Sequence, residues 1–159
     1  SWNGNQEANF GAALKASIVL CGTINGMPLV YGGQEAGLNR SLKFFEKDQI
    51  DWSKMPYEGL FKKLFDLKHH NHALWNGEQG GVMIRIFNDK PEQVISFSRS
   101  KNDNQVIPII NYSDKPVTVT LDSKYQKGTY TELFSNASYE LKGNDVITLA
   151  PWNYLVLTK

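Results

Sequence analysis

The hydrophobic pattern of this chain changes its period near residue 80, and that change limits the folds open to it. After the glycine-containing stretch Asn76–Gly81, short runs of alternating apolar and polar residues are separated by turn-forming Asn, Asp, Gly and Pro. In one run, Val117, Val119 and Leu121 alternate with threonines, which is typical of a sheet with one face in water. The runs are VMIRIF, QVISFSRS, QVIPIINYS, PVTVTL, GTYTELF, DVITL and NYLVLT. Residues 77–159 are therefore predicted to form an antiparallel β-sandwich with Greek-key connections.

The residues before this change of period follow a helical pattern. Apolar residues recur at helical spacing from Phe10 to Cys21, and a second amphipathic helix is predicted from about Pro56 to His70. Between them, Leu29–Tyr31 is too short for a helix and apolar on both sides, which predicts a strand buried on both faces of a parallel sheet. Because a parallel strand needs parallel neighbours and none is found nearby, the first half of the chain is predicted to be an incomplete β/α unit.

Charge and composition exclude several classes of function. The chain has 17 basic and 16 acidic residues, a net charge of +1, and no run of Lys or Arg, so neither nucleic acid nor an anionic membrane is an expected partner. No apolar stretch reaches the roughly 20 residues needed to span a bilayer. The single Cys21 cannot form an internal disulfide and is expected to be a small core residue, which leaves the compartment open.

One segment, GMPLVYGGQEAG (Gly26–Gly37), resembles the eighth barrel strand and adjoining loop of the alpha-amylase family of glycoside hydrolases. DQIDWS, PYEGLFKKLFDLKHHNHAL and the closing PWNYLVLTK are similar, in the same order, to that family's last barrel helix and C-terminal all-β domain. SWNGNQE resembles the segment just after the family's seventh strand. The resemblance implies an α+β chain: residues 1–76 would be the C-terminal remnant of a catalytic (β/α)8 barrel, with two helices and one strand, and residues 77–159 the β-sandwich domain.

The resemblance also implies an activity for a longer parent enzyme. Such an enzyme would hydrolyse α-glucosidic bonds of starch-like glucans with retention, using two carboxyl groups about 5 Å apart. The motifs that carry the family's catalytic Asp, Glu and Asp do not occur here, so no catalytic residue is predicted and the chain alone is expected to be inactive. The resemblance implies that the parent enzyme can bind calcium, but no cofactor is predicted for the residues of this chain. The sequence does not determine which glucan the parent enzyme uses. It also does not determine whether that enzyme hydrolyses the bond or transfers the glycosyl group.

The candidate site residues are Trp2, Gln34 and Glu35. Loops at the carboxyl ends of barrel strands build the active site, and the glycines of Gly32–Glu35 permit a tight turn that folds Gln34 and Glu35 back towards the barrel mouth. Their predicted role is to support the site by hydrogen bonds, with a direct sugar contact or a catalytic role as alternatives. Trp2, placed after the seventh strand by the resemblance, is the tryptophan expected nearest a substrate groove. The other three tryptophans are expected to pack: Trp52, Trp75 and Trp152.

Two further groups of polar residues have a structural interpretation. Asp48 and Asp51 are predicted to form turns, because Asp side chains accept hydrogen bonds from nearby backbone N–H groups. His69, His70 and His72 lie near a helix C-terminus, where a cation is favourable, and they lack a carboxylate partner. No metal site is predicted.

Two rival functions remain open at this point. The sandwich could be a carbohydrate-binding module if aromatic side chains formed a row on one face, or a purely structural domain that covers the barrel. A carbohydrate-binding module is not favoured, because the tyrosines of this half are scattered among strands and turns. They are Tyr112, Tyr125, Tyr130, Tyr139 and Tyr154.

An incomplete barrel also predicts exposed apolar surface. Parts of Phe10, Ile18, Leu29 and Val30 would lack the neighbours they pack against in a complete barrel. Burial of apolar surface contributes roughly 25 cal/mol per Å². The chain is therefore predicted to self-associate through its first half, or to pack these elements in an arrangement unlike a barrel.

Overall fold

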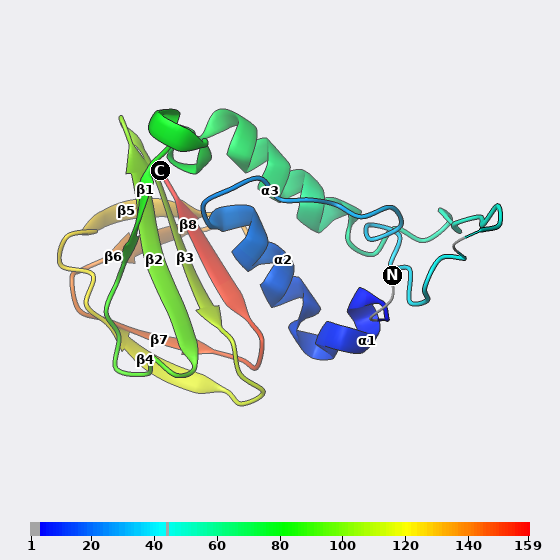
Figure 1. The fold of residues 1–159 in the computed structure, drawn as a ribbon. Helices are drawn as coiled ribbons and strands as arrows, with labels where there is room; N and C mark the ends of the chain where they lie inside the picture. The colour runs from blue at the N-terminus through cyan, green and yellow to red at the C-terminus, as the bar shows by residue number, and fades with distance from the viewer. Residues whose placement is uncertain (1–3, 44) are drawn as a thin grey trace.

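The computed structural model describes residues 4–43 and 45–159, which form a helical layer beside a β-sandwich (Figure 1). The helical layer contains α1 (Gln6–Phe10), α2 (Leu14–Thr23) and α3 (Glu58–His70). Short 3-10 turns lie at Gly11–Ala13, His72–Leu74 and Gly77–Gln79. Both predicted helices are present, and the change from helices to strands occurs where the hydrophobic period changes.

The eight strands form two antiparallel sheets. The larger sheet has the order β1-β2-β3-β8-β5-β6, and β4 pairs with β7 in the second sheet. The strands are β1 (Val82–Arg85), β2 (Val94–Lys101), β3 (Asn104–Asn111), β4 (Val117–Leu121), β5 (Gly128–Glu132), β6 (Ser138–Leu141), β7 (Asp145–Leu149) and β8 (Tyr154–Thr158). Every predicted run contains a strand, which confirms the β-sandwich. Only β6 was missed, because its four residues contain just two apolar side chains.

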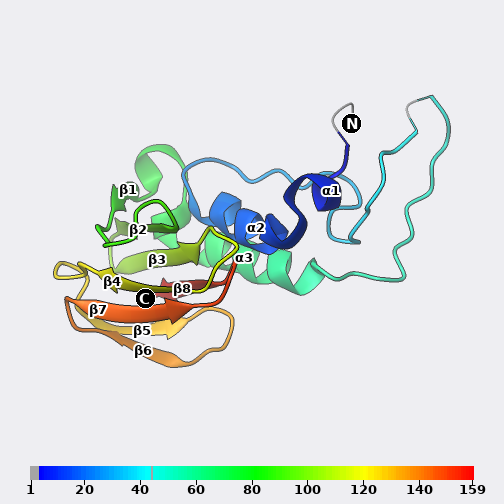
Figure 2. The ribbon, with the colours of Figure 1, turned by 90° about the horizontal axis from the view of Figure 1, so that it is seen from below.

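Strand β3 is buried on both faces and separates two hydrophobic cores. Ile107 and Ile109 point into the sandwich core, against side chains of β4 and β7. Val106 and Ile110 point the other way, into a core shared with α2 and α3. The helical layer and the β4–β7 pair therefore cover opposite faces of the same strand (Figures 1 and 2).

Arg99 joins the helical layer to the sheet. Its guanidinium is 1% exposed and donates to the backbone carbonyls of Gly81, Thr23, Ile24 and Trp75 at 2.8–3.3 Å. Burial lowers the pKa of this guanidinium from its ordinary value. Two of the four carbonyls lie at the end of α2, where the helix leaves its last carbonyls without intrahelical partners.

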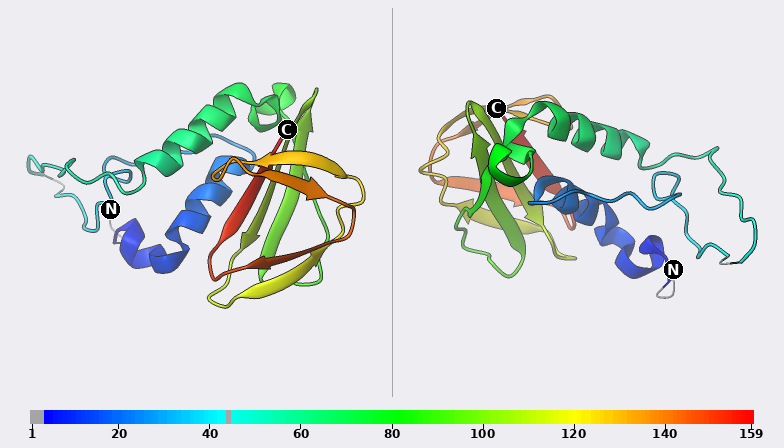
Figure 3. Two further views of the ribbon diagram at one scale, coloured as in Figure 1. Left: turned by 180° about the vertical axis from the view of Figure 1, so that it is seen from behind. Right: turned by 45° about the horizontal axis from the view of Figure 1, so that its top comes forward.

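The predicted strand at Leu29–Tyr31 is wrong. The segment has irregular backbone, and Leu29 is 85% exposed, while Val30 packs against the helical core. A strand needs a neighbour to pair its backbone groups, and every pairing in the described part of the chain is antiparallel and made by residues after 80. Figure 3 shows the connection between α2 and α3 extending away from the sandwich.

Three smaller predictions about the first helix also need correction. The helix begins at Leu14 rather than Phe10, because Gly11 has a φ of 48° and separates α1 from the turn after it. Ile18, expected at the exposed surface, is 5% exposed in the helical core. Cys21, expected in the core, is exposed. Phe10 is exposed as predicted, at 44%.

Candidate functional site

The turn after Tyr31 holds Gln34 by local hydrogen bonds. Gln34 N–H donates to the Tyr31 carbonyl at 2.9 Å, and the Gln34 side-chain Oε1 accepts from Tyr31 N–H at 3.2 Å. Gly33 has a φ of 90°, and a Cβ there would lie 3.1 Å from Leu38, so the turn requires glycine as predicted. The side-chain oxygen of Gln34 thus closes its own turn.

Glu35 comes directly after this turn and carries a buried oxygen, Oε2, with no hydrogen-bond partner. Its backbone carbonyl accepts from Tyr57 N–H at 3.2 Å, which fixes the turn against the start of α3. The residue lines a cavity of about 430 Å³ together with Val30, Met55, Glu58, Phe61, Lys62 and Phe65. A buried polar atom without a partner is costly, so Oε2 is a place where a donor from another group would bind favourably.

Gln34 lines a different cavity, of about 270 Å³, between α1 and the loop after Tyr31. Gln6 lines it too, and the Gln6 side-chain Oε1 is a second buried oxygen without a partner. On the same wall, the Tyr57 hydroxyl donates to the Glu7 carboxylate at 2.5 Å. Burial, together with this carboxylate, raises the pKa of Tyr57 to about 12. Gln34 and Glu35 therefore belong to two separate cavities, and Trp2 lies outside the described residues.

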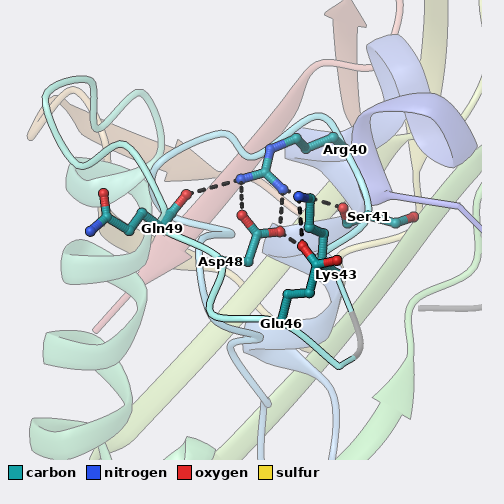
Figure 4. Close-up of polar contacts among 6 residues, drawn as sticks. All are labelled: Arg40, Ser41, Lys43, Glu46, Asp48 and Gln49. Atoms are coloured by element: carbon teal, nitrogen blue, oxygen red, sulfur yellow. Dashed lines mark hydrogen bonds and ion pairs between the residues drawn. The ribbon is translucent and has the colours of Figure 1, made fainter.

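An ion pair closes the loop that contains Arg40, which also lines the 270 Å³ cavity (Figure 4). The Arg40 guanidinium donates to both carboxylate oxygens of Asp48, at 2.6 and 2.8 Å, and to the Gln49 carbonyl at 2.9 Å. Lys43 N–H donates to Asp48 at 2.8 Å. These hydrogen bonds, that of Arg40 first, lower the pKa of Asp48 to about 2. Asp51 accepts from Ser53 N–H at 2.9 Å, which confirms its turn-forming role, whereas Asp48 is bound mainly by the Arg40 side chain.

The histidines near the end of α3 interact with neighbouring groups. His70 Nδ1 lies 2.8 Å from the Asp66 carbonyl, and His72 Nδ1 lies 3.2 Å from the Asn102 side-chain amide. Within residues 4–43 and 45–159, no group of three or more His, Cys, Asp or Glu could hold a metal ion.

The three described tryptophans differ in how far they pack. Trp152 contacts Tyr112 edge to face, with ring centroids 5.6 Å apart, as predicted. Trp75 is 37% exposed and donates to the His69 carbonyl at 3.2 Å. Trp52 is 50% exposed, so the packing predicted for it is not observed.

Among the described helices, none combines the length and the apolar character that crossing a bilayer requires.

The β-sandwich has a match among known protein families. The family model described as maltogenic amylase, C-terminal domain, matches residues 84–156. Residues 84–156 are therefore similar to the C-terminal domain of maltogenic amylases. The resemblance of this chain to the alpha-amylase family is thereby confirmed.

Curated relatives of this chain extend the likeness into the helical layer. Alpha-amylase 2 of Dictyoglomus thermophilum is 30% identical over 130 residues, which is 74% of this chain and 21% of that protein. A beta/alpha-amylase of Paenibacillus polymyxa is 28% identical over 99% of this chain and 13% of its own length. The chain thus spans about a fifth or less of the length of these relatives.

Solved structures show the same fold. A maltogenic alpha-amylase AmyB from Thermotoga neapolitana superposes with a TM-score of 0.77 over 94% of this chain and 36% of its own, at 23% identity. An alpha-amylase from Anoxybacillus superposes with a TM-score of 0.73 over 91% of this chain and 31% of its own, at 18% identity. Because the sandwich makes up about half of this chain, these superpositions include much of the helical layer.

Proposed function

We propose that this chain is the C-terminal part of an alpha-amylase-like glycoside hydrolase that acts on α-glucosidic bonds of starch-like glucans. Residues 1–76 would be the end of its catalytic barrel, and residues 77–159 the sandwich domain after it. The single observation that carries this proposal is the family match at 84–156, continued into the helical layer by the superposition over 94% of the chain.

The environments of the candidate carboxylates agree with the expectation that this chain alone is inactive. Retaining hydrolysis needs one protonated and one ionised carboxyl group about 5 Å apart across the bond that is cut. Asp48 forms an ion pair with Arg40, and Asp51 accepts a hydrogen bond from the backbone N–H of Ser53. Glu35 faces a cavity walled mainly by apolar side chains, in which the other acidic residue is Glu58 at the start of α3. In this proposal the catalytic acids belong to a preceding part of the enzyme.

The two unpartnered buried oxygens have a role in this proposal. Gln6 Oε1 and Glu35 Oε2 would accept hydrogen bonds from the rest of the barrel, which would place Gln34 and Glu35 in support of the substrate site. Trp2 would lie nearest the substrate. Exposed apolar side chains on the same layer, Met27 at 82% and Leu29 at 85%, would be covered there. In isolation, this surface would drive self-association of the chain.

Release of reducing sugar from soluble starch tests the proposal. The purified 159-residue chain should release none, and a longer protein that adds the preceding barrel strands should release it readily. Glu35→Gln in that longer protein should lower kcat/KM without abolishing activity, because the variant keeps the shape and one acceptor oxygen. Turnover by the 159-residue chain alone, or a longer protein without activity on α-glucans, would contradict the proposal. Sedimentation velocity of the chain should show a species larger than a monomer.

A further inference from the structure

The sandwich exposes two aromatic side chains among its described residues. Of the five tyrosines in this half, Tyr130 is buried and three pack partly against the cores, whereas Tyr125 is 83% exposed. Phe87, just after β1, is 67% exposed. Aromatic residues are among the costlier side chains to leave in water, so their exposure at one place is informative.

Backbone pairing brings these two residues to the same region. Asn88 forms an antiparallel bridge with Leu121, and Asp122 N–H donates to the Phe87 carbonyl at 2.9 Å. Phe87 therefore stands opposite Asp122, and side chains opposite each other on antiparallel strands lie on the same face, about 5 Å apart at their Cβ atoms. Tyr125 lies three residues after Asp122, which limits the distance between their Cα atoms to about 11 Å.

Charged groups lie beside each of the two rings. The Lys124 ammonium lies 3.4 Å from the Asp122 carboxylate and 5.0 Å from the centre of the Tyr125 ring. The Arg85 guanidinium lies 5.7 Å from the centre of the Phe87 ring. The side chains of Asp122 and Lys124 are 45% and 54% exposed, so their polar groups are open to a ligand. Each ring therefore lies beside a cation, and Lys124 links the Tyr125 ring to the Asp122 carboxylate.

The backbone that displays Tyr125 is fixed by hydrogen bonds. Ser123 N–H donates to the Leu121 carbonyl at 3.0 Å, and Gln126 N–H donates to the Ser123 carbonyl at 2.8 Å. The Ser123 hydroxyl donates to the Asp145 carboxylate, which also accepts from Lys142 and Gly143 N–H. A ring held on such a turn loses little conformational freedom when it binds.

We propose that Phe87, Asp122, Lys124 and Tyr125 form a binding surface for an α-glucan chain, separate from the cavities beside α1 and α3. Pyranose rings present a face of C–H groups that packs on an aromatic ring, and a rim of hydroxyl groups that pairs with a carboxylate and an ammonium. The Asp122 carboxylate, the Lys124 ammonium and the Arg85 guanidinium beside Phe87 supply an acceptor and donors for those hydroxyl groups. The ligand class rests on the proposed function, while the surface itself rests on the exposed rings and the backbone pairing that brings their segments together.

In the longer enzyme this surface would hold one part of a polymer while another part reaches the catalytic centre. Binding at a second place on the same molecule raises the effective concentration of substrate at the first. The surface would therefore matter for polymeric starch and little for a short oligosaccharide that cannot reach both places.

Affinity electrophoresis of the 159-residue chain in gels with and without amylopectin tests the proposal, with calorimetry against maltoheptaose as the second measurement. Wild-type protein should be retarded by amylopectin. Tyr125→Ala and Phe87→Ala should each weaken binding about tenfold, the size of one good aromatic contact. Tyr125→Trp should retain binding, because the ring is kept. Val146→Ala removes an exposed apolar side chain, 68% exposed on β7, and should leave binding unchanged.

Circular dichroism of each variant separates loss of binding from loss of folding. Absence of retardation for folded wild-type protein, or equal retardation of wild type and the Phe87→Ala, Tyr125→Ala double variant, would overturn the proposal. Equal binding of the β-linked cellohexaose would overturn the α-glucan assignment. The starch-hydrolysis assay of the longer protein is independent of these measurements, so failure of the proposed function is distinguished from failure of this surface.

Discussion

The sandwich and the segment between α2 and α3 differ in how they satisfy their backbones. In the sandwich, each strand has an antiparallel neighbour from the same half of the chain, and strands such as β4 and β7 place alternate side chains in the core. The segment around Leu29–Tyr31 has an equally apolar sequence but no neighbouring strand, and Leu29 and Tyr31 are exposed at 85% and 54%. Apolar composition alone therefore does not make a strand, because the pairing partner decides.

The largest expected difference in stability is between truncating an aliphatic side chain in the sandwich core and truncating one of the same size in the exposed segment. Ile107→Ala removes a side chain that is 0% exposed in the sandwich core, which should lower the free energy of unfolding by about 4 kcal/mol. Leu29→Ala is the matched control and should change it by less than about 0.5 kcal/mol. Urea unfolding followed by circular dichroism measures both values. A loss of about 2 kcal/mol or more in Leu29→Ala would break the comparison.

Arg99 tests how the two regions are joined. Arg99→Met keeps the length of the side chain but leaves the carbonyls of Gly81, Thr23, Ile24 and Trp75 without this donor, and each unsatisfied acceptor is costly. The expected loss is about 3 kcal/mol in the same urea experiment. Ser100→Ala, at the next position of β2, is the control with little expected effect. Equal stability of Arg99→Met and wild type would show that water replaces the guanidinium at no cost.

The sequence predicted the regular half well because its information is local. Period-two runs such as VTVTL specify a strand and its buried face without reference to distant residues. The role of Arg99 could not be predicted in this way, since its four acceptors come from positions up to 76 residues away. The unpartnered oxygens of Gln6 and Glu35 likewise depend on which groups surround them in space.

The surface at Phe87 and Tyr125 was missed for a related reason. The alternating pattern identified strands, but Phe87 and Tyr125 lie in connections, and a bridge between Asn88 and Leu121 brings their segments together. The tyrosines that looked equivalent in the sequence proved to have very different exposures, from 3% for Tyr130 to 83% for Tyr125. The exposure of a side chain in a connection depends on which segments pack beside it in the folded protein, and the local sequence pattern does not specify those segments.

A smaller effect is expected where α1 meets α3. Tyr57→Phe removes the hydroxyl that donates to Glu7 and should lower stability by about 1 kcal/mol near neutral pH. Because the folded state raises the pKa of Tyr57 from 10.0 to about 12, the contribution is complete below about pH 10 and disappears as the pH rises through about 12. The difference in thermal midpoint between wild type and variant, measured against pH, checks this. Tyr125→Phe, whose ring is 83% exposed, should show no such difference.

The smallest effect concerns the loop closed by Arg40 and Asp48. Because the folded state lowers the pKa of Asp48 from 3.8 to about 2, the ion pair is complete above about pH 4 and is lost as the pH falls through about 2. Carboxyl resonances monitored by NMR should show Asp48 titrating near pH 2. In Arg40→Ala the midpoint should move up towards 3.8. An unchanged midpoint in that variant would mean that backbone hydrogen bonds alone hold the carboxylate.

Hydrogen exchange of backbone amides most directly tests the claim that pairing partners, rather than apolar sequence, separate the two regions. The amides of Ile107, Ile109 and Ile110 within β3 should be protected to nearly the full free energy of unfolding, while those of Leu29 and Val30 should exchange at rates close to an unstructured chain. Comparable protection at Leu29, Val30 and β3 would contradict the account, because it would require a paired strand at 29–31.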